Sequence, residues 1–114
     1  MSERNRLDET IISIGFAKSA ASLERMLPQF NVLVHKVRKI RIMGSAALAM
    51  VYVASGRFDA YVEGGIRLWD IAAGGLILQC AGGDFFNQPI DHQHTYSILA
   101  NNGKLRRKLQ ATFR

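Results

Sequence analysis

Apolar and polar residues follow two different periods along the chain, and these periods predict alternating strands and helices. Four segments are rich in apolar and β-branched residues, which is typical of strands: residues 10–16, 40–43, 58–63 and 95–100. In the third segment, apolar positions alternate with Asp59, Tyr61 and Glu63. This period of two predicts a strand with one buried face and those three side chains on the other face.

Four further segments carry apolar residues at helical spacing: residues 23–37, 46–55, 71–81 and 105–113. Ser22 and Ser45 are predicted to cap the first two helices, since a serine oxygen can accept a free backbone N–H at a helix start. Pro28 lies inside the first helix and is expected to kink or divide it. Residues 84–94 contain proline and many polar residues, so they are predicted to form a loop.

Strand and helix alternate from one end of the chain to the other. This order predicts an α/β fold, with a largely parallel or mixed layered sheet that helices flank. The 114 residues suit a single α/β domain, residues 1–114, and 48% of them are hydrophobic, enough for a core.

A run of small residues distinguishes the third predicted helix. Asp70 precedes it and can act as its N-cap, and Gly82-Gly83 mark its end. Gly74 and Gly75 weaken a helix by about 1 kcal/mol each relative to alanine. We therefore expect another part of the molecule to approach this helix closely at the two glycines. Trp69 is predicted to pack in the core.

The chain has a formal net charge of +6, which raises the question of nucleic-acid binding. The basic residues are spread along the sequence, and aromatic residues are not interleaved with them as stacking platforms. A solvated basic surface is the simpler interpretation, so we do not expect a nucleic-acid partner. Binding to nucleic acid nevertheless remains an alternative function, the second of the two alternatives that the sequence leaves open.

Cys80 is the single cysteine and is predicted to be a small buried residue, which leaves no disulfide within one chain. No leader is visible in residues 1–10, and no apolar run approaches the roughly 20 residues that span a bilayer. These features predict a cytoplasmic protein with no membrane partner. The histidines His35, His92 and His94 do not form a metal-ligand set.

Taken together, several motifs resemble the carboxyl-terminal half of the inositol monophosphatase family, in the right order and with the right gaps. They are residues 41–48 (Arg-Ile-Met-Gly-Ser-Ala-Ala-Leu), 52–63, 68–74 (Leu-Trp-Asp-Ile-Ala-Ala-Gly) and 81–83 (Ala-Gly-Gly). The resemblance implies a layered α/β subdomain that packs on an amino-terminal half. That half, with a Glu-Glu pair and an Asp-Pro-Ile/Leu-Asp-Gly-Thr motif that bind magnesium, has no counterpart in this sequence. Residues 88–92 are only superficially similar to the second motif, and Asp91 is expected to be an ordinary loop residue.

The resemblance implies roles for five residues. Asp70 would be a Mg²⁺ ligand, Glu63 would accept a hydrogen bond from a substrate hydroxyl, and the turn Gly44, Ser45 and Ala46 would line the polyol. Each residue also has a purely structural interpretation: a helix N-cap for Asp70, a surface carboxylate at a strand end for Glu63, and an ordinary strand-to-helix turn for Gly44–Ala46. No nucleophile with an adjacent base is present, so the resemblance assigns no catalytic residue here.

The family therefore implies a Mg²⁺-dependent phosphatase that hydrolyses an inositol or sugar phosphate, and this chain alone is expected to be incomplete. The first alternative is a non-catalytic binding or assembly module of the same ancestry. The missing half should leave an apolar face uncovered. We therefore expect the chain to form a homo-oligomer or to pair with a partner chain that supplies the amino-terminal half.

Overall fold

A computed structural model describes residues 1–17, 19–91 and 93–113. Among the described residues, four α-helices and five strands follow a short 3₁₀ turn at Leu7–Glu9. They alternate as the hydrophobic pattern predicts, except that an additional strand precedes the last predicted one. In chain order the elements are β1 (Ile11–Gly15), α1 (Ala20–Val34), β2 (Lys39–Arg41), α2 (Ala46–Ala54), β3 (Ala60–Arg67), α3 (Leu68–Cys80), β4 (Asp84–Pro89), β5 (Thr95–Asn101) and α4 (Arg106–Thr112).

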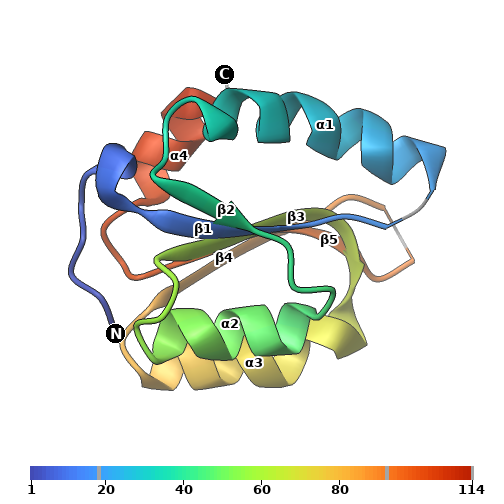
Figure 1. Cartoon of the computed structure of the whole chain (residues 1–114). Helices are drawn as coiled ribbons and strands as arrows, with labels where there is room; N and C mark the ends of the chain where they lie inside the picture. The colour runs from blue at the N-terminus through green and yellow to red at the C-terminus, as the bar shows by residue number, and fades with distance from the viewer. Residues whose placement is uncertain (18, 92, 114) are drawn as a thin grey trace.

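The five strands form one mixed sheet in the order β2-β1-β3-β5-β4. β1 lies parallel to both β2 and β3, whereas β5 is antiparallel to β3 and β4. Figure 1 shows α1 and α4 on one face of the sheet and α2 and α3 on the other. The α/β fold with a layered sheet between helices is confirmed.

Each face of the sheet has its own core. Ile12, Val62 and Leu99 pack under α1 and α4, whereas Tyr61 and Ile98 pack against α2 and α3. Because helices cover both faces, the prediction that β3 has one buried face is wrong: Tyr61 is buried and so is Asp59, just before the strand. A strand buried on both sides need not alternate in polarity.

The small residues of α3 allow two close approaches, as predicted. A β-carbon on Gly74 would lie 2.9 Å from Met50 Cε of α2, and one on Gly75 would lie 2.2 Å from the ring of Phe85 on β4. The helix ends before Gly82, which adopts a left-handed φ of 90°. The glycines therefore let α3 pack directly against α2 and the sheet.

Four predictions about the helices are corrected. Ser19 rather than Ser22 caps α1, and Ser22 is buried beside Gly64 instead. α1 continues through Pro28 as one helix and is not divided there, and residues from both of its halves pack in the core. Asp70 is not an N-cap: α3 begins at Leu68, which places Asp70 within its first turn. Cys80 is exposed, since it lies on the side of α3 that faces away from the sheet.

The predicted loop 84–94 is also wrong in its first part, which forms strand β4. β4 is one of the two edge strands and pairs only with β5, so its polar residues Asn87 and Gln88 can point to water and Pro89 can end it. Among the described residues, the structure contains no helix that is long and apolar enough to cross a membrane.

Candidate functional site

A cavity of about 650 Å³ opens at the carboxyl ends of the parallel strands. The chain leaves β1 toward α1 on one face of the sheet, and it leaves β2 and β3 toward α2 and α3 on the other face (Figure 1). Connections that diverge in this way leave a crevice beyond the strand ends, which is the usual ligand-binding place in α/β sheets. The position of the cavity therefore follows from the connections between strands and helices, whatever the side chains are.

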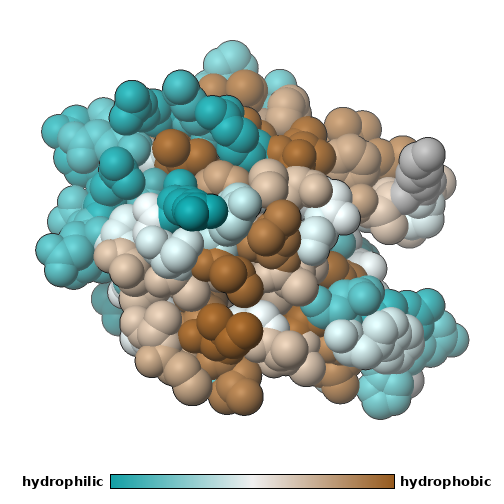
Figure 2. Space-filling view, turned by 60° about the horizontal axis from the view of Figure 1, so that its bottom comes forward, coloured by the Kyte–Doolittle hydropathy of each residue, from teal (hydrophilic) through white to brown (hydrophobic). Residues whose placement is uncertain are grey.

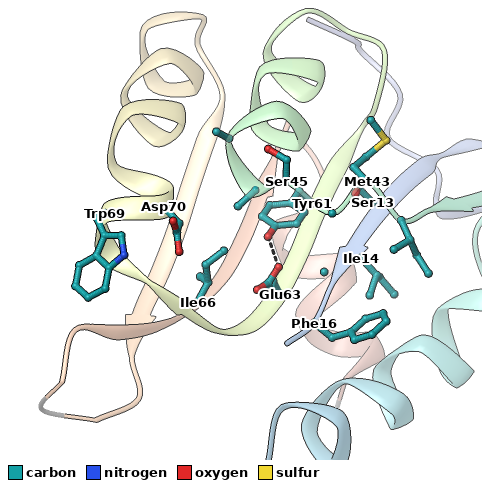
Figure 3. A pocket seen from close by; sticks show the side chains of 15 residues that line it. Ser13, Ile14, Phe16, Met43, Ser45, Tyr61, Glu63, Ile66, Trp69 and Asp70 are labelled. Carbon is teal, nitrogen blue, oxygen red and sulfur yellow. Dashed lines mark hydrogen bonds between the residues drawn. The ribbon is translucent and has the colours of Figure 1, made fainter. Parts of the chain in front are cut away.

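The five residues that the sequence indicated converge on this cavity from three segments: Gly44, Ser45, Ala46, Glu63 and Asp70. Figure 3 shows Glu63 on β3 at the floor of the cavity, with Asp70 at the start of α3 beside it. These positions are up to 26 residues apart in the sequence. Their convergence on one cavity is a property of the fold that the sequence pattern alone does not contain.

Glu63 is held by a neighbour on its own strand. Tyr61 donates its phenolic hydrogen to Glu63 Oε1 at an oxygen–oxygen distance of 2.5 Å. Both side chains lie on the same face of the strand because they are two residues apart. Burial raises the pKa of Glu63 above its ordinary value, the hydrogen bond from Tyr61 opposes this rise, and the charge of Asp70 adds to it. Burial likewise raises the pKa of Tyr61, and the charge of Glu63 adds to that rise.

Gly15 of β1 makes room for this pair. It lies opposite Glu63 in the parallel ladder, and a β-carbon there would be 1.8 Å from Glu63 Oε1 and 3.0 Å from the Tyr61 hydroxyl. Such a distance is far below a normal contact, so a larger residue would force the carboxylate out of its place. The position of the Glu63 carboxylate therefore depends on a glycine in the neighbouring strand.

The other side chains form the rim. As predicted, Ser45 caps α2: its hydroxyl oxygen accepts a hydrogen bond from the Leu48 N–H at a distance of 3.1 Å. Gly44, the residue before it, has a left-handed φ of 71°. Trp69, which was predicted to lie in the core, is 67% exposed at the cavity edge. The guanidinium of Arg67 lies 5.7 Å from its ring. Figure 3 shows Trp69 at the start of α3 with its ring turned away from Glu63.

The carboxylates of the cavity do not make up a complete metal site. Mg²⁺ prefers six oxygen ligands, usually one or two carboxylates with waters and substrate phosphate. Across the described part of the chain, no group of three His, Cys, Asp or Glu residues lies close enough to hold a metal ion. Asp70 is exposed and offers one free carboxylate, whereas Glu63 is already engaged by Tyr61. The donor set thus fits one metal ligand and not a whole metal site.

Asp91 lies outside the cavity, as expected for a loop residue. Its Oδ1 accepts hydrogen bonds from the backbone N–H groups of Gln93 and Thr95, and these bonds shape the turn between β4 and β5. They hold the pKa of Asp91 below its usual value. His92 lies outside the described residues, so the structure does not describe its place relative to His94.

Sequence reasoning did not single out Ser13 and Tyr61, although both line the cavity. Both lie inside strands and are buried, so a period of two gives no sign of their function. The signal that identifies them is the register of the parallel pair, in which Ser13 lies opposite Tyr61 and Gly15 opposite Glu63. That register is a tertiary property.

Comparisons with known proteins agree with this architecture. An inositol-1-monophosphatase of Synechocystis is 40% identical over 107 residues, covering 90% of this chain and 37% of that protein. The Nus factor SuhB of Pseudomonas aeruginosa is 35% identical and covers 98% of this chain and 43% of its own length. The structure of SuhB from Mycobacterium tuberculosis superposes with a TM-score of 0.86 at 32% identity, over 97% of this chain and 43% of that chain.

The chain therefore spans about two fifths of the length of these relatives. The sequence model of the inositol monophosphatase family matches residues 2–114. Together with the sheet order and the cavity at the ends of its parallel strands, this match shows that the chain belongs to the inositol monophosphatase family.

Proposed function

We propose that this chain provides the polyol-binding part and one metal ligand of a Mg²⁺-dependent phosphatase that acts on an inositol or sugar phosphate. The observation that carries the proposal is the convergence of Gly44–Ala46, Glu63 and Asp70 on one cavity. Similarity to proteins named inositol monophosphatases supports the same reaction class. Whole relatives are more than twice as long, so the activity is proposed for the assembled protein.

Each residue has a distinct role in this proposal. Glu63 accepts a hydrogen bond from a substrate hydroxyl, and the turn Gly44, Ser45 and Ala46 lines the polyol ring. Asp70 holds Mg²⁺, which when bound supplies positive charge to the phosphate oxygens. Since the described residues supply a single metal ligand, we expect the isolated chain to be catalytically weak or inactive.

A binding or assembly module is the second candidate, and the outer face of α2 and α3 supports it. Both helices are apolar on nearly all sides, which is typical of helices that are covered on two sides. Leu76 is 61% exposed on this face, and Leu48 and Ile77 are exposed as well. Figure 2, which brings this side forward, shows apolar surface over much of its lower half.

We propose that a partner chain carrying the remainder of the relatives' length covers this outer face, and that a homo-oligomer does so when no such partner is present. The start of α3 connects the face to the cavity, since Trp69 and Asp70 line the cavity at the end of the same helix. A layer on this face would therefore reach the place where metal ligands are lacking. A cytoplasmic location is also proposed, because the exposed thiol of Cys80 suits a reducing compartment.

Calorimetric titration of inositol 1-phosphate into the purified chain, with and without millimolar Mg²⁺, tests the function. We expect binding that Mg²⁺ strengthens, and no such strengthening in Asp70→Asn. Absence of binding, or a magnesium effect that survives Asp70→Asn, would contradict the proposed role of the cavity. Magnesium-dependent phosphate release that Asp70→Asn abolishes would instead show that the chain is active without a partner.

Sedimentation over a concentration series tests the assembly proposal. We expect the chain to self-associate and Leu76→Glu to weaken that association, with Gln79→Glu on the same helix as the matched charge control. A chain that stays monomeric at every concentration while folded would count against oligomer formation.

A further inference from the structure

Strand β1 places a serine in the cavity that the proposed function does not yet use. Ser13 is 1% exposed and belongs to the residues that line the cavity. Among the described residues, Ser13 Oγ has no hydrogen-bond partner. A buried hydroxyl without a partner is unusual in folded proteins and calls for an explanation, such as a bound water or ligand.

The register of the sheet fixes where this hydroxyl lies. Ser13 is paired with Tyr61 and Gly15 with Glu63, so Ser13 lies one side-chain repeat deeper along the same face of the sheet. Tyr61 cannot serve both neighbours as a donor, because its single hydroxyl hydrogen goes to Glu63. The serine hydroxyl therefore receives no hydrogen from Tyr61, and Ser13 lies beside the Glu63–Tyr61 pair in the lining of the cavity.

The chemistry of the two groups suits one kind of ligand. The Glu63 carboxylate accepts hydrogen bonds, whereas a serine hydroxyl both donates and accepts. A polyol carries hydroxyl groups on neighbouring carbons, so one hydroxyl can donate to Glu63 while the next bonds to Ser13. A phosphate group suits this floor poorly, because a buried carboxylate repels it.

We propose that Ser13 is a specificity-determining substrate contact, whose hydroxyl binds a second hydroxyl group of the polyol next to the one that Glu63 holds. This assignment rests on the proposed function, because it takes a polyol phosphate as the occupant of the cavity. It extends the binding surface from β3 onto β1, which none of the motifs in the sequence indicated.

The test compares the binding of inositol 1-phosphate and of inorganic phosphate to folded variants by calorimetry in millimolar Mg²⁺. Ser13→Ala should weaken inositol 1-phosphate binding about five- to tenfold, the usual loss for one hydrogen bond. Ser13→Thr, which keeps the hydroxyl, should stay close to wild type. Inorganic phosphate should bind equally to all variants, and Ser97→Ala on the opposite face of the sheet is the matched control.

Monodeoxy analogues of inositol 1-phosphate give a second readout that needs no variant. Two hydroxyl positions should matter to the wild-type chain, and Ser13→Ala should remove the sensitivity at one of them.

Unchanged inositol 1-phosphate binding in Ser13→Ala, while Glu63→Gln weakens it, would overturn the assignment of Ser13 and leave the proposed function standing. An equal loss for inositol 1-phosphate and inorganic phosphate would also overturn it, since the serine would then act only on the structure. A wild-type chain that binds no polyol phosphate would overturn both proposals.

Discussion

Two carboxylates on and beside β3 have different surroundings: Asp59 is buried just before the strand, whereas Glu63 is half-buried in its middle. Asp59 is 0% exposed, and its oxygens accept from the Ile11 N–H at 2.7 Å, from Arg4 at 3.4 Å and from the Ser2 hydroxyl. Glu63 faces the cavity, and Tyr61 is its one side-chain donor among the described residues. The start of β3 thus carries a fully bonded carboxylate, whereas its cavity side carries one that is left partly free.

The difference indicates a structural role for Asp59 and a ligand-binding role for Glu63. A carboxylate with several donors ties the amino-terminal segment to the sheet, and the same end holds Asn102, which also bonds to Ser2 and Arg4. A carboxylate with one donor, an unpartnered Ser13 beside it and a raised pKa is costly unless a ligand completes it. The satisfied carboxylate of Asp59 thus stabilises the fold, whereas the free bonding capacity of Glu63 and Ser13 lies at the cavity.

The largest expected effect is a loss of stability on substitution of Asp59. Asp59→Asn should lower the free energy of unfolding by about 3 kcal/mol, because it removes a charged acceptor from several buried donors. Urea unfolding measures the change. Asp8→Asn, an exposed carboxylate that bonds to Arg6, is the control and should change stability by less than about 1 kcal/mol. Equal effects of the two substitutions would contradict the structural role of Asp59.

A smaller effect is expected beside the cavity. Gly15→Ala should lower the free energy of unfolding by about 1–3 kcal/mol, the usual cost of overpacking, because the new methyl group overlaps the Glu63 carboxylate. The same substitution in a Glu63→Ala background should cost clearly less, since the overlapping atoms are gone. If the cost in urea unfolding is the same in both backgrounds, the close approach of Gly15 and Glu63 is not its cause.

The smallest effect is a pH dependence of opposite sign at two carboxylates. The raised pKa of Glu63 favours its protonated form in the folded chain, so its contribution is present below pH 4.5 and is lost as pH rises through the folded-state pKa. The lowered pKa of Asp84, which bonds to Arg106, gives a contribution that is present above pH 3.8 and lost on acidification.

Urea unfolding across this range should therefore show that Glu63→Gln removes the loss of stability on the alkaline side. Asp84→Asn should remove the loss on the acid side. Curves for the two variants that parallel the wild type would contradict these assignments.

The order of elements could be predicted from the sequence, because apolar periodicity reports burial directly. The caps at Ser45 and Gly82 followed from local chemistry, and the close approach at Gly74 followed from the cost of glycine in a helix. Strand β4 was missed since an edge strand carries polar residues. Trp69 was misplaced because its exposure depends on how the start of α3 is oriented against the sheet, which is a tertiary property.

The site could be predicted only in part. Glu63 and Asp70 were identified by resemblance, and their roles remain proposals. Ser13 and Tyr61 were beyond reach, since their position depends on the register between β1 and β3, which two separate segments fix only when they pair. Residues within one motif are visible in a sequence, whereas residues that a sheet brings together are not.

The most direct test of the contrast between the two ends is a matched pair of charge-neutralising variants, Asp59→Asn and Glu63→Gln. Each is assayed for thermal unfolding and, at a temperature where it is folded, for inositol 1-phosphate binding in millimolar Mg²⁺. We predict that Asp59→Asn lowers the unfolding temperature and keeps binding, whereas Glu63→Gln does not lower the unfolding temperature and weakens binding at least fivefold. Loss of stability without loss of binding in Glu63→Gln would contradict the account.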